Sequence, residues 1–156
     1  MSSKFPPEPD PFTPEEFAAW RGLLRLRETV TRAIDARLRA EHKLSIDDYG
    51  ILITLVGQPD QRQRMSALGE QRLLTPSGIT RAVARLEERG LLRRDPDPAD
   101  GRAYFATLTP KGVQQLRAAQ RTHHAIVREL YLSRLEPREV AQLGKLFEKA
   151  VSSPPR

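Results

Sequence analysis

The chain has 156 residues, of which 38% are hydrophobic and 29% are charged. This length fits one compact domain, or a helical body with one small module built into it. The absence of cysteine excludes disulfides, thiolate nucleophiles, thiol redox sensing and cysteine-ligated zinc. The formal net charge of +6 and the pI near 10.2 favour a polyanionic partner such as nucleic acid, although an arginine-rich proteome would give the same balance.

The N-terminal segment is rich in proline and charge. Residues 1–12 contain Pro6, Pro7, Pro9 and Pro11, and we expect them to form a disordered tail. The segment lacks the basic-then-apolar pattern of a secretory signal. Apolar stretches elsewhere are shorter than the ~20 residues that a transmembrane helix needs. We therefore expect a cytoplasmic protein without membrane association.

A long amphipathic helix is predicted directly after the tail. Thr13 is a candidate N-cap, Pro14 suits the first helical position, and Glu16 stands where a capping box needs an acidic residue. Apolar residues then recur at helical spacing out to about His42. Because such a helix is long for a small domain, we expect part of its apolar stripe to pack on another chain. The stripe consists of Phe17, Trp20, Leu24, Val30, Ile34 and Leu38.

The remaining elements alternate between helical patterns and turn signals. Ser45 and Asp48 form a second capping pair, and Gly57 ends that helix. Two strand-like stretches, 91–95 and 103–109, flank a turn-rich segment and predict a β-hairpin. In chain order we expect a helix at 45–57, a polar loop at 58–65, a short helix at 66–72 and a helix at 75–90. The hairpin follows at 91–109, and two further helices at 110–134 and 137–150.

The segment from Ser66 to Arg102 carries the strongest functional signal. A short helix, a tight turn and a second helix form a helix–turn–helix layout. On a helical wheel the second helix turns Ile79, Val83 and Leu86 inward. Small and polar residues on its other face would let it enter the major groove and reach base edges. These predicted DNA-binding residues are Ser77, Thr80, Arg81 and Arg85. The alternative is an ordinary amphipathic helix with a solvated outer face.

The hairpin that follows strengthens the interpretation. Between Gln61 and Arg102 there are nine arginines and six acidic residues. A basic hairpin after a recognition helix can place Arg102 in the adjacent minor groove, where negative potential is concentrated. We expect Asp100 to hold the Arg102 guanidinium through a bidentate pair. Alternatively, Asp100 only closes the turn with Gly101.

Residues 100–109 (DGRAYFATLT) resemble the wing of the MarR family of bacterial transcription factors, in which Asp-x-Arg is followed by five residues and Leu-Thr. The segments RMSALGEQRLLTPSGITRAVARLEERGLLRR and LTPKG also stand where that family has its helix–turn–helix, wing and next helix. The likeness covers residues 13–150. It implies a mainly α fold with a small β-hairpin wing: a winged helix–turn–helix at 45–109, and dimerisation helices at 13–44 and 110–151.

The resemblance also implies partners. A homodimer would bind a pseudo-palindromic site on double-stranded DNA, with half-sites about one helical turn apart. The apolar stripes agree with a dimer, although they could instead pack within one subunit. By analogy with the family we expect a repressor that is released by a small-molecule ligand. The alternative is a winged helix used for architectural DNA binding or protein contacts, without a ligand response.

Relatives of this kind bind small anionic or phenolic molecules between the dimer body and the winged module, and the residues that could border such a cleft here are Trp20, Arg27, His42 and Tyr49. We expect no metal and no cofactor, since the neighbours His123 and His124 point to different helix faces. The chain has no glycine-rich phosphate loop, metal-ligand cluster or nucleophile motif. We therefore do not expect an enzyme.

Overall fold

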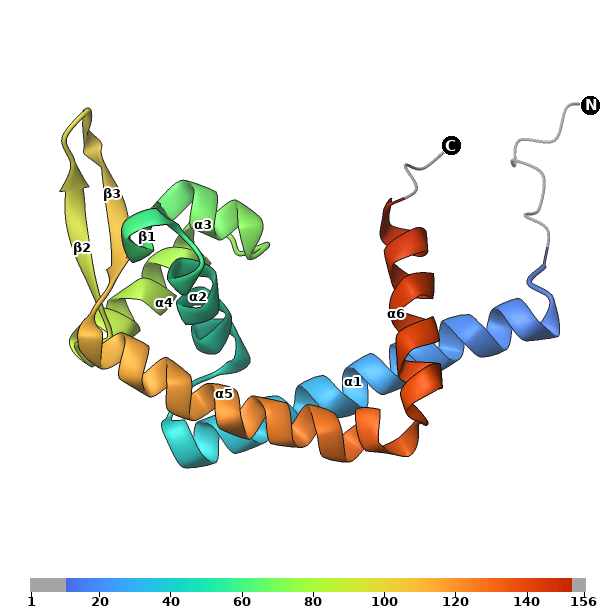
Figure 1. Cartoon of the computed structure of the whole chain (residues 1–156). Coiled ribbons are helices and arrows are strands. Elements are labelled where there is room, and N and C mark those ends of the chain that lie inside the picture. The colour runs from blue at the N-terminus through green and yellow to red at the C-terminus, as the bar shows by residue number, and fades with distance from the viewer. Residues whose placement is uncertain (1–10, 153–156) are drawn as a thin grey trace, which may run out of the picture.

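The computed structural model describes residues 11–152; residues 1–10, which make up most of the predicted disordered tail, lie outside the described residues. Two long helices lie side by side and form the body, and a compact module with a β-hairpin stands at one end of it (Figure 1). None of the helices within residues 11–152 is both long and apolar enough to cross a membrane. The elements are α1 (Pro14–His42), α2 (Ile46–Val56), a 3-10 turn (Pro59–Gln61), β1 (Arg62–Arg64), α3 (Met65–Gln71), α4 (Pro76–Glu88), β2 (Leu92–Asp97), β3 (Asp100–Leu108), α5 (Pro110–Leu130), a second 3-10 turn (Leu132–Arg134) and α6 (Pro137–Ser152).

Side-chain caps fix where the helices begin. In α1, Thr13 Oγ1 accepts from the Glu16 N–H at 3.2 Å, and Glu16 Oε2 accepts from the Thr13 N–H at 2.8 Å. The same reciprocal box joins Ser45 and Asp48 at the start of α2, with both hydrogen bonds at 3.0 Å. Each box satisfies two N–H groups that the helix itself leaves unpaired. Both predicted capping boxes are confirmed, and Thr75 and Thr109 cap α4 and α5.

The small sheet has three antiparallel strands in the order β1-β3-β2. The expectation of a polar loop over 58–65 was wrong for residues 62–64, which pair with β3. The hairpin strands also run further than expected, so that the turn contains only Pro98 and Ala99 between them. The sequence Arg-Gln-Arg has no apolar alternation, and its extended conformation comes from ladder hydrogen bonds with a distant strand.

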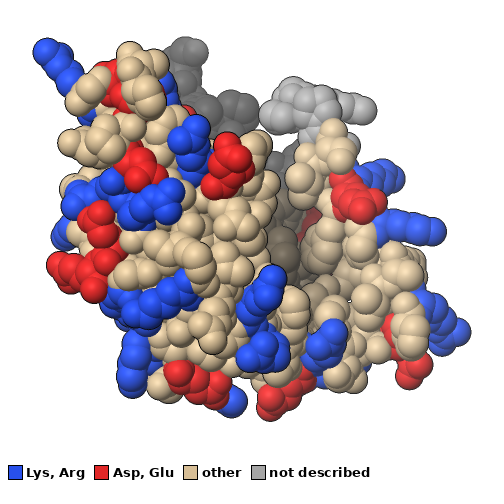
Figure 2. Space-filling model, turned by 60° about the vertical axis from the view of Figure 1, so that its left-hand side comes forward, with Lys and Arg blue, Asp and Glu red and all other residues tan. Residues whose placement is uncertain are grey.

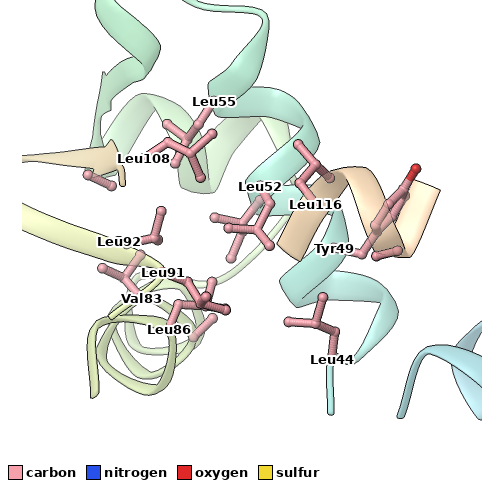
Figure 3. Packing of buried hydrophobic residues seen from close by; sticks show 14 of the residues in the cluster. Leu44, Tyr49, Leu52, Leu55, Val83, Leu86, Leu91, Leu92, Leu108 and Leu116 are labelled. Carbon is pink, nitrogen blue, oxygen red and sulfur yellow. The ribbon is translucent and has the colours of Figure 1, made fainter. Parts of the chain in front are cut away.

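The hydrophobic core lies in the module and where the module meets the inner ends of α1 and α5. Leu52, Leu86 and Leu116 bring α2, α4 and α5 together, and each is at most 1% exposed (Figure 3). The start of α5 lies directly against the start of β2: a Cβ at Gly112 would overlap the carbonyl oxygen of Leu91. The predicted inward face of α4 is confirmed, since Ile79, Val83 and Leu86 are all buried.

The outer half of the body is not covered. Phe17 and Trp20 on α1 are each 50% exposed, and Leu146 on α6 is 53% exposed. Over its described residues 137–152, α6 has no buried side chain. The core therefore ends well before the N-terminal tip of α1, although on α5 it extends to Ile126.

Candidate nucleic-acid interface

The helix–turn–helix is formed by α3, a tight turn and α4. The two helices approach closely at Gly69, where an added Cβ would lie 3.3 Å from Ile79 Cγ2. In the turn, Leu73 adopts a left-handed conformation with φ of 54°, and its side chain is 93% exposed. The backbone N–H of Leu74 donates to the Gly69 carbonyl at 2.9 Å and completes the turn. This packing directs the N-terminal end of α4 away from the core.

The outer face of α4 presents three of the predicted residues at the surface. Ser77, Thr80 and Arg81 are all exposed. Thr80 Oγ1 donates to the Pro76 carbonyl at 2.8 Å, and Arg81 Nε donates to the Ser77 carbonyl at 3.3 Å. Because these hydrogen bonds stay within α4, the hydroxyl and the guanidinium remain on the solvent side, where groups that read base edges must lie.

The structure gives Arg85, also predicted to bind DNA, a partner within the chain. Its Nη2 lies 2.9 Å from Oδ1 of Asp48 on α2, whose side chain is 8% exposed. Asp48 also forms the capping box of α2. Arg85 therefore links the recognition helix to α2, and a contact of Arg85 with DNA stays a prediction.

The wing tip differs from the expected arrangement. Arg102 is exposed on β3, as predicted. Asp100 Oδ1, however, accepts from the backbone N–H of Arg102 at 3.0 Å, and within residues 11–152 no ion pair joins Asp100 to the Arg102 guanidinium. A short carboxylate reaches the N–H two residues on more readily than a guanidinium that extends into solvent. The bidentate pair is thus replaced by the alternative, a carboxylate that closes the turn.

The end of β2, next to the wing turn, is held by a contact that the sequence did not predict. Arg64 Nη2 on β1 lies 2.5 Å from Oδ2 of Asp97, whose side chain is 4% exposed. Asp97 Oδ1 accepts from the N–H of Ala99 at 2.8 Å. From the sequence, Asp97 was expected only to be part of the turn, because the partner strand β1 was itself not predicted.

A second acidic residue neutralises positive charge on the hairpin. Asp95 Oδ2 accepts from the Thr107 hydroxyl at 2.6 Å, and Arg93 Nε donates to Asp95 at 3.0 Å. The Thr107 hydrogen bond, followed by the Arg93 contact, lowers the pKa of Asp95 despite its partial burial. Arg62, by contrast, makes a cation–π contact: its Cζ lies 4.8 Å from the centroid of the Phe105 ring.

A cleft of about 450 Å³ separates the wing from α3 and α4. It has three arginines and three hydroxyl side chains among its walls, which suits an anion such as a backbone phosphate. Figure 2 shows Lys and Arg side chains on this side of the molecule, with Asp and Glu among them. The lining residues are Arg64, Met65, Ser66, Thr80, Arg94, Arg102, Ala103 and Tyr104.

Comparison with known proteins identifies the architecture. The model of the MarR family matches residues 42–103. The transcriptional regulator HosA of Escherichia coli O111:H- is 32% identical over 110 residues, which are 70% of this chain and 79% of that protein. The HTH-type transcriptional regulator YkoM of Bacillus subtilis strain 168 is 31% identical over 110 residues, or 70% of each chain. The chain belongs to the MarR family.

Solved structures agree with this assignment. The fold is similar to that of Sco3205, a MarR family transcriptional regulator from Streptomyces coelicolor crystallised in complex with DNA; the TM-score is 0.81 at 32% identity, over 94% of this chain and 91% of that one. The predicted fold class, mainly α with a winged helix–turn–helix, is confirmed. This MarR-family protein is a DNA-binding transcriptional regulator, and its relatives are regulators rather than enzymes.

The four predicted ligand residues do not border one cleft within this MarR-family subunit. Trp20 lines an apolar cleft between α1 and α6, whereas Arg27 lines a polar groove beside Ile46 of α2. His42 lies at the end of α1, with Nε2 2.8 Å from Thr122 Oγ1. Tyr49 is 7% exposed, and burial raises the pKa of its hydroxyl. Spacing along α1 could not reveal which residues share a cavity.

His123 and His124 make ring contacts at the surface of α2. His123 stacks on Tyr49 with 5.1 Å between ring centroids, and His124 meets His123 edge-on at 5.7 Å. Burial, and then the charge of His124, lower the pKa of His123. Within residues 11–152 no group of three His, Cys, Asp or Glu residues could hold a metal ion. The Tyr49–His123 stack joins α2 to α5.

Proposed function

We propose that this MarR-family protein binds a pseudo-palindromic operator as a homodimer and represses transcription from it. The observation that carries the proposal is the position of the cleft between wing and helix: exposed Thr80 on α4 and exposed Arg102 on β3 line the same cleft. A DNA strand running through it would have the major groove on the α4 side and the minor groove on the wing side. Ser77 and Arg81 would then reach base edges, and Arg102 would enter the minor groove.

The exposed apolar face of the body supports the homodimer. A cleft of about 590 Å³ between α1 and α6 is lined by large apolar side chains, including Trp20, Leu143 and Phe147. Exposed patches of this kind mark association surfaces. A second copy would cover the outer part of α1 and the whole of α6. Residues 13–44 and 110–151 would then form the dimer body, although their inner parts, such as Leu38 and Leu116, also belong to the core of the module.

The operator proposal is tested by fluorescence anisotropy with labelled fragments of the DNA that flanks the gene. One palindromic fragment should bind more tightly than a scrambled duplex of the same length. Affinity should fall steeply as salt rises, because phosphate contacts release counterions. Equal affinity for all fragments would contradict the operator and favour the architectural alternative. Repression is tested separately, by a reporter gene placed behind the preferred fragment.

We also propose that a small anionic or phenolic molecule releases the protein from DNA. Support comes from a groove of about 450 Å³ along α1 beside Ile46 of α2, where Arg27 and Arg32 offer positive charge and Arg39 is paired with Asp35. A ligand there would favour one spacing of the two modules, with a coupling of about 1–3 kcal/mol. Benzoate and phenol serve as probes in the anisotropy assay. Unchanged DNA affinity at saturation, with binding shown by calorimetry, would contradict release.

A further inference from the structure

The end of α1 is held by a side chain that comes from just beyond the recognition helix. The last carbonyls of a helix have no partner within it and carry partial negative charge. Lys43 ends α1 in a left-handed conformation with φ of 56°. Arg89 Nη1 donates to the Lys43 carbonyl at 2.5 Å, and Arg89 Nη2 donates to the His42 carbonyl at 3.0 Å. One guanidinium thus caps two adjacent carbonyls.

Helix α5 joins the same contact. Gln115 Nε2 donates to the His42 carbonyl at 3.2 Å, and Lys111 Nζ donates to the Arg89 carbonyl at 2.7 Å. The ends of α1 and α4 and the beginning of α5 therefore meet in one set of hydrogen bonds. We name this set, made by His42, Lys43, Arg89, Lys111 and Gln115, the three-helix joint.

Arg89 is the last of three arginines spaced four residues apart along α4. Residues at this spacing lie on one side of a helix. Arg81 lies toward the N-terminal end of α4, and its Nε donates to the Ser77 carbonyl within that helix. Arg85 pairs with Asp48 of α2, and Arg89 reaches α1. The same side of α4 therefore changes from a reading surface to an attachment surface along its length.

We propose that Arg89 is a positioning residue that fixes the tilt of the recognition helix against α1, and through it the separation of the two recognition helices in the dimer. The inference rests on the proposed function, because it needs a dimer that binds two half-sites. Arginine suits the role, since its rigid fork can hold two carbonyls at once, whereas lysine offers a single point charge. Arg89 acts through the backbone of α1 and need not touch DNA.

Because α4 is long, a small change in its tilt moves its far end by a measurable distance. The 13 residues of α4 span roughly 20 Å at 1.5 Å each. A tilt of about 10° at the joint moves the reading end by about 3.4 Å, which is the rise of one base pair. Loss of the Arg89 fork should therefore weaken the preference for one half-site spacing rather than the attraction to DNA in general.

The test compares the wild type, Arg89→Ala, Arg89→Lys and Arg117→Ala on the preferred fragment and on fragments with one base pair inserted or deleted at its centre. Arg117 is exposed on α5, so its variant removes the same charge without disturbing the joint. We expect Arg89→Ala to reduce the ratio of affinities between the native and altered spacings by roughly three- to tenfold, as the loss of two hydrogen bonds allows. Arg89→Lys should lie between Arg89→Ala and the wild type, and Arg117→Ala should keep the wild-type ratio.

Sedimentation and circular dichroism establish that each variant is a folded dimer; if Arg89→Ala does not fold, the ratio for Arg89→Lys decides the question. A wild-type ratio in the folded Arg89 variants would overturn the positioning role alone. A wild type that prefers no fragment would overturn the operator proposal, and the positioning role with it. An equal loss of affinity at all three spacings would show that Arg89 acts through its charge and not by fixing the tilt of α4, which also overturns the inference.

Discussion

Arg64 on β1 and the buried Asp97, the last residue of β2, form an ion pair beside the wing turn, with 2.5 Å between Nη2 and Oδ2. The two strands are not neighbours, because β3 lies between them in the sheet. The pair thus spans the sheet and holds the end of β2 next to the wing turn. Removing either group should loosen the hairpin beside its turn, close to Asp100.

We expect Asp97→Asn to lower the free energy of unfolding by about 1 kcal/mol, since a charge-assisted contact is lost but the half-exposed Arg64 can be solvated. The amide oxygen can still accept from Ala99, so the turn should survive. Urea unfolding measures the loss. Asp100→Asn, at an exposed position on the same hairpin, is the control. An equal effect of the two changes would mean that burial of the pair contributes nothing.

If the protein binds DNA as proposed, Arg102→Ala should weaken DNA binding about tenfold while leaving the proposed dimer intact, because the variant would remove one guanidinium from the minor groove. The slope of log affinity against log salt should become shallower by about one unit. Anisotropy titrations at several salt concentrations give both quantities. Arg121→Ala, an exposed arginine on α5, controls for net charge. Unchanged affinity of the Arg102 variant would contradict a wing contact with DNA.

Leu73→Asn should stabilise the protein by about 0.5–1 kcal/mol. Leucine in a left-handed conformation costs roughly 1–2 kcal/mol, and asparagine tolerates it better. With 93% of the side chain exposed, little apolar burial is lost in exchange. Thermal unfolding followed by circular dichroism measures the gain. A lower midpoint than that of the wild type would show that Leu73 makes a stabilising contact, for example across the dimer.

The stack of His123 on Tyr49 predicts a pH dependence of stability. Because the pKa of His123 is lowered from 6.5 in the folded state, the unfolded chain binds the proton more readily. The contribution of His123 is therefore complete above pH 6.5 and is lost as the pH falls below that value. His123→Phe keeps an aromatic ring against Tyr49 and should make the urea midpoint nearly independent of pH between 7 and 5. An unchanged pH profile in the His123 variant would contradict the assignment.

Local chemistry made the helices and the wing motif predictable. Thr13 with Glu16 and Ser45 with Asp48 each form a complete cap within four residues, so the sequence contains all of the interaction. The inward face of α4 follows in the same way from its periodicity. Contacts between distant residues were not predictable: Arg85 meets Asp48 across 37 positions. Strand β1 escaped prediction because its three polar residues become a strand only by pairing with β3.

The close approach at Gly112 has a mechanical consequence. With no room for a methyl group between α5 and the Leu91 carbonyl, the beginning of α5 cannot slide over the start of β2 without breaking the core. The wing, α4 and the first turns of α5 should therefore move as one rigid piece. Any change in the separation of the two modules of the proposed dimer would then have to shift α1, whose inner end is held by the polar contacts of the three-helix joint and by the buried side chains of Ile34 and Leu38.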